Sequence, residues 1–372
     1  GYNMGVLRDA VDIMNRIEAA GVPIPTDYRD RVRNMYDYVF AIATPELGGP
    51  MFGDASRSAG VAKDRSRMYL FSTLVEATEL LDDPKYSARA NLLLDRLPKE
   101  TSFAFSEAGI YVMRDRWGPE QVYFALHCSP KGISSHDQAD NGTFELCAFG
   151  RWLMPDTGFF TYGHDPQKRE WHRRTSNHQT LTLDGKQSNI AGRHLLWSSS
   201  PNGTVVCVEN ASYPDLKHRR TVWFVDDRFL VLLDEAIGAA QGALDLHFQL
   251  APGDVDVNVS RNQAVTKFAD ANVLLRCQST ASIEMQREEG WYAWKYGHRT
   301  PRTAVRVRSK QPAPAAFITI LYPFKGTQAP DVSGHFTESF RLGADRVECE
   351  VQVGQETWKI GRDLKKRETW CK

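Results

Sequence analysis

The chain has 372 residues, of which 42% are hydrophobic and 25% charged, a composition typical of a globular protein with room for two domains. Because 46 Lys and Arg residues balance 46 Asp and Glu residues, no overall positive field favours a nucleic-acid partner. No apolar run approaches the roughly 20 residues that cross a bilayer, so we expect no membrane insertion. The six cysteines are scattered without a C-x-x-C pair, so we expect free buried thiols rather than disulfides.

The first hundred residues are expected to be helical. Breakers divide them at Gly21 to Pro25, Thr44 to Pro50 and Asp82 to Pro84, and a third helix is expected near Arg67 to Leu81. The first two helices are expected where apolar residues recur at spacings of three and four: Val6, Ala10, Ile13 and Ile17, then Val32, Met35, Val39 and Ile42. The chain starts Gly-Tyr-Asn-Met-Gly without an initiator Met, so we expect the C-terminal part of a longer protein.

From about Ser102 the pattern changes to short β-rich runs separated by Gly, Asp, Asn and Pro. At least a dozen runs follow one another without intervening helices, and no period of 20 to 50 residues repeats. We therefore expect a large antiparallel sandwich. The expected strands are Ile110–Arg114, Val122–His127, Phe144–Phe149, Gln179–Leu183, Thr204–Asn210, Arg219–Phe224, Phe229–Asp234, Leu244–Leu250, Val273–Gln278, Ala304–Ser309, Ala316–Tyr322, Arg346–Val353 and Thr357–Gly361.

The interval from Ser134 to His178 concentrates residues with ligand-like spacing. It reads Ser-His136-Asp-Gln138-Ala-Asp-Asn-Gly-Thr-Phe, then Met-Pro-Asp156-Thr-Gly, then Asn-His178-Gln-Thr. On a strand, His136 and Gln138 would point the same way, because alternate residues share a face. For each alone a structural role remains open: a lone histidine is usually a satisfied core residue, and an Asp before Thr-Gly is a common turn carboxylate.

These blocks resemble the heparinase II/III-like polysaccharide lyases, closest to the heparin-sulfate lyase branch, polysaccharide lyase family 12. Three family blocks occur in order, at His136 to Phe144, Asp156 to Tyr162 and Thr175 to Thr180. The resemblance implies an α+β multidomain chain. Residues 1–100 would be the C-terminal part of an incomplete α/α toroid, and residues 101–372 a large antiparallel β-sandwich.

The resemblance also implies β-elimination, in which a base removes the C5 proton of a uronic acid and an acid protonates the oxygen leaving C4. Tyr2 matches the family's catalytic tyrosine and His136 its histidine, so these two are the expected catalytic pair. Asn3 stands where many relatives have histidine, and we expect it to contact substrate. The family residue that neutralises the uronate carboxylate lies upstream of this sequence.

A single divalent metal ion is the expected cofactor, because Gln138, Asp156 and His178 match the positions that bind a metal in relatives. An amide in place of the more usual histidine makes the ligand set harder, so calcium or manganese becomes as plausible as zinc. We expect the ion to brace strands and take no part in the chemistry.

Two clusters are candidates for contact with an acidic saccharide. Arg169, Arg173 and Arg174, with Trp171 between them, suit sulfate or carboxylate groups, although a solvated loop explains the charges equally well. The segment from Trp291 to Arg302 is aromatic and basic for a connection in a β-domain, and suits sugar stacking; a strand edge packed on its neighbour is the alternative.

The expected function is cleavage of a glycosaminoglycan, heparan sulfate above others, by elimination that leaves 4,5-unsaturated uronate ends. An alginate or oligo-alginate lyase is the alternative enzyme, and a catalytically inactive protein that binds acidic polysaccharides is the alternative without catalysis. Location in the bacterial periplasm or outside the cell is implied by resemblance only.

Overall fold

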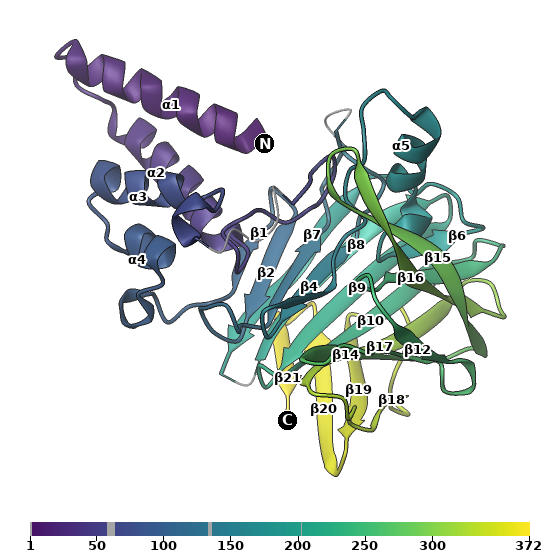
Figure 1. Ribbon diagram of the computed structural model, residues 1–372. Helices are drawn as coiled ribbons and strands as arrows, with labels where there is room; N and C mark the ends of the chain where they lie inside the picture. Colours follow the sequence, from purple (N-terminus) through teal and green to yellow (C-terminus); the bar gives the residue numbers. More distant parts are fainter. Residues whose placement is uncertain (1, 58–63, 133–135, 202) are drawn as a thin grey trace.

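The computed structural model describes residues 2–57, 64–132, 136–201 and 203–372, and for Tyr2 the backbone alone. The chain is mostly β-sheet with few helices; the helices of the N-terminal part gather on one side and the sheets on the other (Figure 1). In the described ranges, no helix has the length and apolar content that crossing a membrane requires. The six cysteines are buried free thiols, which confirms the expectation.

The helical part comprises α1 (Tyr2–Ala19), α2 (Thr26–Ile42), α3 (Phe71–Leu81) and α4 (Lys85–Asn91), with single 3₁₀ turns at Arg65–Arg67 and Leu94–Arg96. The predicted breakers fall between these helices, but α4 was not predicted. In α1 the apolar residues that indicated the helix are not the ones that it buries: Val6 and Ile13 are 59% and 48% exposed. The helix instead buries a second stripe with the same spacing, formed by Met4, Leu7, Val11 and Met14.

A five-stranded antiparallel meander follows the helices. Its strands lie in chain order and are β1 (Phe103–Phe105), β2 (Ile110–Arg114), β3 (Tyr123–His127), β4 (Phe144–Ala148) and β5 (Arg151–Met154). The connection from β3 to β4 contains His136 and Gln138.

An eight-stranded antiparallel sheet forms the centre of the β part. Its order is β12 (Val255–Asn258), β13 (Gln263–Thr266), β14 (Ala271–Ser279), β17 (Ala315–Lys325), β10 (Phe229–Gly238), β9 (Leu216–Val225), β8 (Gly203–Tyr213) and β7 (Gly192–Ser200).

Two four-stranded sheets complete the β part. One has the order β15 (Ile283–Lys295), β16 (His298–Ser309), β11 (Leu244–Gln249) and β6 (Leu181–Leu183). The other contains β18 (Val332–Phe336), β19 (Arg346–Val353), β20 (Glu356–Asp363) and β21 (Glu368–Cys371).

Both faces of the central sheet are buried, which explains the continuous apolar runs of its strands. In β10, Leu230 and Leu232 join the core shared with the five-stranded meander and with β11 and β16. Val231 and Leu233 face the opposite side and pack with residues of β19 and β20. Successive strand residues therefore divide between two cores, and the expected antiparallel layers are present.

The predicted strands are present, although the one expected at Gln179–Leu183 is shorter, and several strands were missed. The most relevant omission is β15, whose alternation of charged and partly exposed residues weakens the apolar signal. The segment from Trp291 to Arg302 is the end of the β15–β16 hairpin, which confirms the alternative interpretation of a strand edge packed on its neighbour. A short α5 (Pro166–Arg173), which starts at the Asp165 cap, precedes the block containing His178.

Candidate functional site

His136 and Gln138 lie in the connection between β3 and β4 and not on a strand, so the expectation that strand alternation aligns them was wrong. Polar contacts fix this connection. The Asp140 carboxylate lies 3.0 Å from Nδ1 of His127, and Asn141 donates to the Ser129 carbonyl at 2.9 Å. The side chain of His136 remains 33% exposed, whereas Gln138 is buried.

Asp54 is the centre of the polar cluster around His136. Its carboxylate accepts from His136 Nδ1 at 3.2 Å, from Gln138 Nε2 at 3.1 Å and from Arg173 Nη1 at 2.9 Å. Arg169 adds an ion pair at 3.6 Å, and the Asp54 side chain is only 1% exposed. Because a carboxylate only accepts, His136 carries its proton on Nδ1, which directs the Nε2 lone pair away from Asp54.

Asp54 belongs to a strap, residues 51–57, that crosses from the helical part onto the β part. The Met51 amide donates to Glu145 at 3.0 Å, and Arg57 pairs with the same carboxylate at 2.6 Å. Glu145 is fully buried, and this burial raises its pKa despite the nearby Arg57. The buried ion pair between Arg57 and Glu145 thus attaches the strap to the meander, and Asp54 of the strap holds His136 there.

Gly53 allows the strap to approach His136 closely. Its φ is +67°, and a Cβ at this position would lie 2.9 Å from the His136 carbonyl oxygen. Gly21 has nearly the same φ, +69°, but open space around it.

We expect Gly21→Ala to cost about 1–2 kcal/mol of unfolding free energy, since only backbone strain is added. Gly53→Ala should cost about 1–3 kcal/mol more, because the backbone of His136 must also move.

Urea unfolding of the two glycine variants measures this difference. Equal losses of unfolding free energy in Gly53→Ala and Gly21→Ala would contradict the close packing of the strap on His136.

Tyr162 lies beside His136, at the end of the second family block. Its hydroxyl is 3.5 Å from His136 Nδ1, the two rings meet edge to face, and the residue is 48% exposed. The hydroxyl of Tyr296, at the tip of the β15–β16 hairpin, accepts from the Tyr162 amide at 3.3 Å. His136, Tyr162 and Tyr296 therefore form one partly exposed surface.

The predicted metal ligands Asp156 and His178 are adjacent and fully buried, with 2.9 Å between Oδ2 and Nδ1. Burial alone would raise the pKa of Asp156, but the charge of His178 and its hydrogen bond lower it below the ordinary value. His178 Nε2 and Gln138 Oε1 are buried without a hydrogen-bond partner in the described part of the chain.

Gln138 Oε1, and His178 Nε2 when the ring is neutral, are electron-pair donors of the kind that a divalent cation accepts, so the donor set fits an ion. Among the described residues, His, Cys, Asp and Glu side chains alone form no group of three. The Gln138 amide is therefore a required member of such a site. His172, which follows Trp171 on α5, is neutral because burial lowers its pKa to about 3.

The other predicted site residues differ in how close they lie to the His136 cluster and in how exposed they are. Tyr2 begins α1, but its side chain lies outside the described residues. Asn3 and Arg174 are exposed and Trp171 is half-buried. Among the described side chains of α1, those from Asn3 onward, none makes a hydrogen bond to the His136 cluster. Of the predicted arginines, Arg169 and Arg173 pair with Asp54.

Sequence reasoning missed Asp54, Arg169 as a partner of Asp54, and the role of Tyr162. Asp54 lies 82 residues before His136, in a Phe-Gly-Asp-Ala segment without a recognisable motif. Tyr162 did have a signal, because it ends the matched Asp156 block.

Comparison with known proteins places these observations in a family. Residues 97–352 match the family model described as Heparinase II/III-like, C-terminal. The heparin-sulfate lyase of Bacteroides stercoris is 31% identical over 351 residues, 91% of this chain and 51% of that protein. That of Pedobacter heparinus is 32% identical over 317 residues, 83% of this chain and 47% of that protein.

The fold is also found among solved structures. The crystal structure of heparan sulfate lyase HepC from Pedobacter heparinus matches with a TM-score of 0.89 at 26% identity, over 98% of this chain and 58% of that one. The present chain thus spans about half the length of the curated relatives that it matches.

Proposed function

Because the chain belongs to the heparinase II/III-like family, we propose that it is part of a lyase that cleaves heparan sulfate by β-elimination. The observation that carries this proposal is the geometry of His136. It lies in a matched family block, is partly exposed, and is oriented by the buried Asp54 with the Tyr162 hydroxyl beside it. The relatives named heparin-sulfate lyase support the choice of substrate.

In this reaction the C5 proton of the uronate is removed and the C4–O bond breaks. Its electron pair leaves with the oxygen, which is protonated, and a C4–C5 double bond remains. With Asp54 on Nδ1, the Nε2 atom of His136 is the group that accepts or returns a proton. We assign the second proton-transfer role to Tyr2, by its match to the family's tyrosine.

Substrate contacts are assigned to Asn3, Trp171 and Arg174. Arg174 is exposed and has the charge that an acidic saccharide needs. Arg173 is already paired with Asp54, so we assign it an indirect role, through the position of His136.

The substrate class is tested by incubating the longest form of the protein with heparan sulfate, heparin, chondroitin sulfate, hyaluronan and alginate. The readout is ultraviolet absorbance of the unsaturated uronate. Product from heparan sulfate supports the proposal. If alginate alone yields product, the protein is a lyase for the alternative substrate. If no polymer yields product but the polymers still bind, the protein is an inactive saccharide-binding protein.

We also propose that Gln138, Asp156 and His178 hold one divalent ion, calcium, manganese or zinc. The ion would supply a structural charge that satisfies buried Gln138 Oε1 and His178 Nε2. It would tie the connection containing Gln138 to the turn containing Asp156.

Metal binding should appear as a change in thermal stability. Adding the ion at about 100 times its Kd should stabilise the fold by about 2.7 kcal/mol, and a chelator should remove this gain. The measurement is Tm with each ion, for the native chain and for His178→Ala. An equal rise in Tm on ion addition for the native chain and for His178→Ala would contradict the assignment of His178 as a metal ligand. His335→Ala, an exposed histidine on β18, is the control.

We assign residues 1–100 to the end of an α/α toroid and residues 101–372 to the β-sandwich domain. The partly exposed apolar side chains of Val6 and Ile13 on α1 suit a face that another helix covers. A periplasmic or secreted location is part of the same proposal and is implied by the family resemblance alone.

A further inference from the structure

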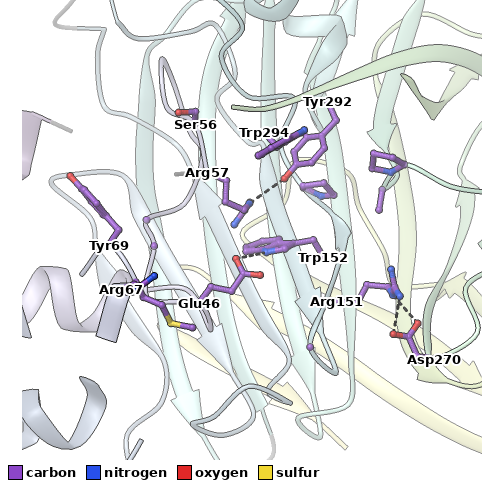
Figure 2. A pocket seen from close by; sticks show the side chains of 17 residues that line it. Glu46, Ser56, Arg57, Arg67, Tyr69, Arg151, Trp152, Asp270, Tyr292 and Trp294 are labelled. Atoms are coloured by element: carbon purple, nitrogen blue, oxygen red, sulfur yellow. Dashed lines mark hydrogen bonds and ion pairs between the residues drawn. The ribbon is translucent and has the colours of Figure 1, made fainter. Parts of the chain in front are cut away.

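A cavity of about 670 Å³ lies between the loops of the helical part and the β part (Figure 2). Its volume falls in the range of roughly 300–1,000 Å³ typical of ligand pockets. In Figure 2, Tyr69 and Arg67 occupy one wall, and Trp152, Tyr292 and Trp294 lie opposite. The expected catalytic pair and the expected metal ligands do not line this cavity, but Tyr292 and Trp294, from the aromatic segment that the sequence marked for sugar stacking, do.

The floor of the cavity is built from half-buried groups that are paired with one another. The Arg57 guanidinium lies 3.3 Å from the centre of the Trp152 ring and donates from Nε to the Tyr292 hydroxyl at 3.2 Å. The Trp152 indole N–H donates to Glu46 at 3.2 Å. Because each of these groups already has partners, the floor keeps its shape when the cavity is empty.

The rim presents groups that are free to meet a ligand. The side chain of Arg67 is 82% exposed, and its ion pair with Asp64 is 3.6 Å long. Tyr69 is 44% exposed, and Trp294 is half-buried on the opposite wall. An aromatic ring offers its face to the apolar side of a sugar ring, and an arginine pairs with a carboxylate or sulfate.

We propose that this cavity binds an acidic sugar residue of the polymer on which His136 acts, outside the residues that perform the chemistry. The inference rests on the proposed function, which it extends by a subsite. Trp294 and Tyr69 would contact the sugar ring, and Arg67 its carboxylate or sulfate group.

Two structural links join the cavity to the His136 cluster. The strap provides both Asp54, which holds His136, and Arg57, in the cavity floor, three residues later. The β15–β16 hairpin provides Trp294 to the cavity and Tyr296 to Tyr162, with a bulge between Tyr292 and Lys295. Bulges change the direction of side chains beside active sites. Here the same hairpin contributes one side chain to the cavity and another to the surface around His136.

The test compares Arg67→Gln and Trp294→Leu with matched controls. Arg16→Gln changes an equally exposed arginine, 78% against 82%, that pairs with an aspartate on α1. Trp358→Leu changes a half-buried tryptophan of β20, which does not line the cavity. The longest form of the protein is used, and Tm establishes that each variant is folded. Arg67→Gln, at an exposed position, decides the question if Trp294→Leu is unfolded.

Binding is measured separately from cleavage. Calorimetric titration of His136→Ala protein uses a heparan sulfate tetrasaccharide and an unsulfated glucuronate-containing tetrasaccharide of equal length. The Arg67 and Trp294 changes should each raise Kd about three- to tenfold, and in the active protein should raise KM with little change in kcat. A smaller effect of Arg67→Gln on the unsulfated probe identifies sulfate as its partner; an equal effect identifies the carboxylate.

The two proposals fail in different ways. If the native protein forms unsaturated product but both cavity variants match their controls in Kd and KM, the subsite is overturned and the lyase stands. If no polymer yields product but the variants still weaken tetrasaccharide binding, the cavity stands as a saccharide site and the lyase proposal fails.

Discussion

Replacing His136 by alanine is expected to lower kcat on heparan sulfate by about 10²- to 10⁴-fold, the range of a lost general acid or base. The side chain is one-third exposed and contributes one hydrogen bond to Asp54, so the fold should persist. KM should change little, because the lost interaction acts in proton transfer and not in uniform binding.

The measurement is the initial rate of unsaturated uronate formation, with Tm beside it. His335→Ala, an exposed histidine on β18, is the matched control and should keep the native rate. A His136→Ala protein with native kcat would remove His136 from the mechanism.

Replacing Asp54 by alanine is expected to reduce both activity and stability. Its carboxylate is buried among Arg173, Arg169 and His136, and without it two guanidinium groups lose their counter-charge. Breaking a buried pair by removing one partner costs about 3–5 kcal/mol of unfolding free energy. The loss of kcat should accompany this cost, because the His136 ring loses the hydrogen bond that Asp54 provides.

Urea unfolding and kcat are measured together for Asp54→Ala and for Asp54→Asn, which keeps the side-chain volume. Asp270→Ala is the control: this carboxylate also makes two hydrogen bonds to an arginine, Arg151, but is 57% exposed. An exposed pair contributes about 0–1 kcal/mol. An Asp54→Ala loss as small as that of Asp270→Ala would contradict the central place of Asp54. For Asp54→Asn, which remains folded more readily, native kcat together with native KM would contradict the positioning role.

Much of the β architecture was predictable from the sequence because its signals are local. The run from Phe229 to Leu233 predicts a strand, and its continuous apolar character follows from two buried faces. The face of α1 was not predictable in the same way. Two apolar stripes share one spacing, and only the packing against α2 selects Leu7 and Met14 over Val6 and Ile13.

The site was predictable only in part, since its contacts are tertiary. The motif order indicated His136, Asp156 and His178, and the structure places the last two in contact. Asp54 contacts His136 across 82 residues of chain, and no spacing rule reaches that far. The hairpin strand β15 escaped notice because its charged residues alternate with few buried ones, as expected for a partly exposed strand.

Elimination and hydrolysis differ in whether water enters the product, so the most direct test is cleavage of heparan sulfate in ¹⁸O-labelled water followed by mass spectrometry. We predict unsaturated ends without the label, formed by the native protein and absent with His136→Ala. Saturated non-reducing ends, with ¹⁸O on C1 of the newly formed reducing ends, would contradict the proposed lyase mechanism.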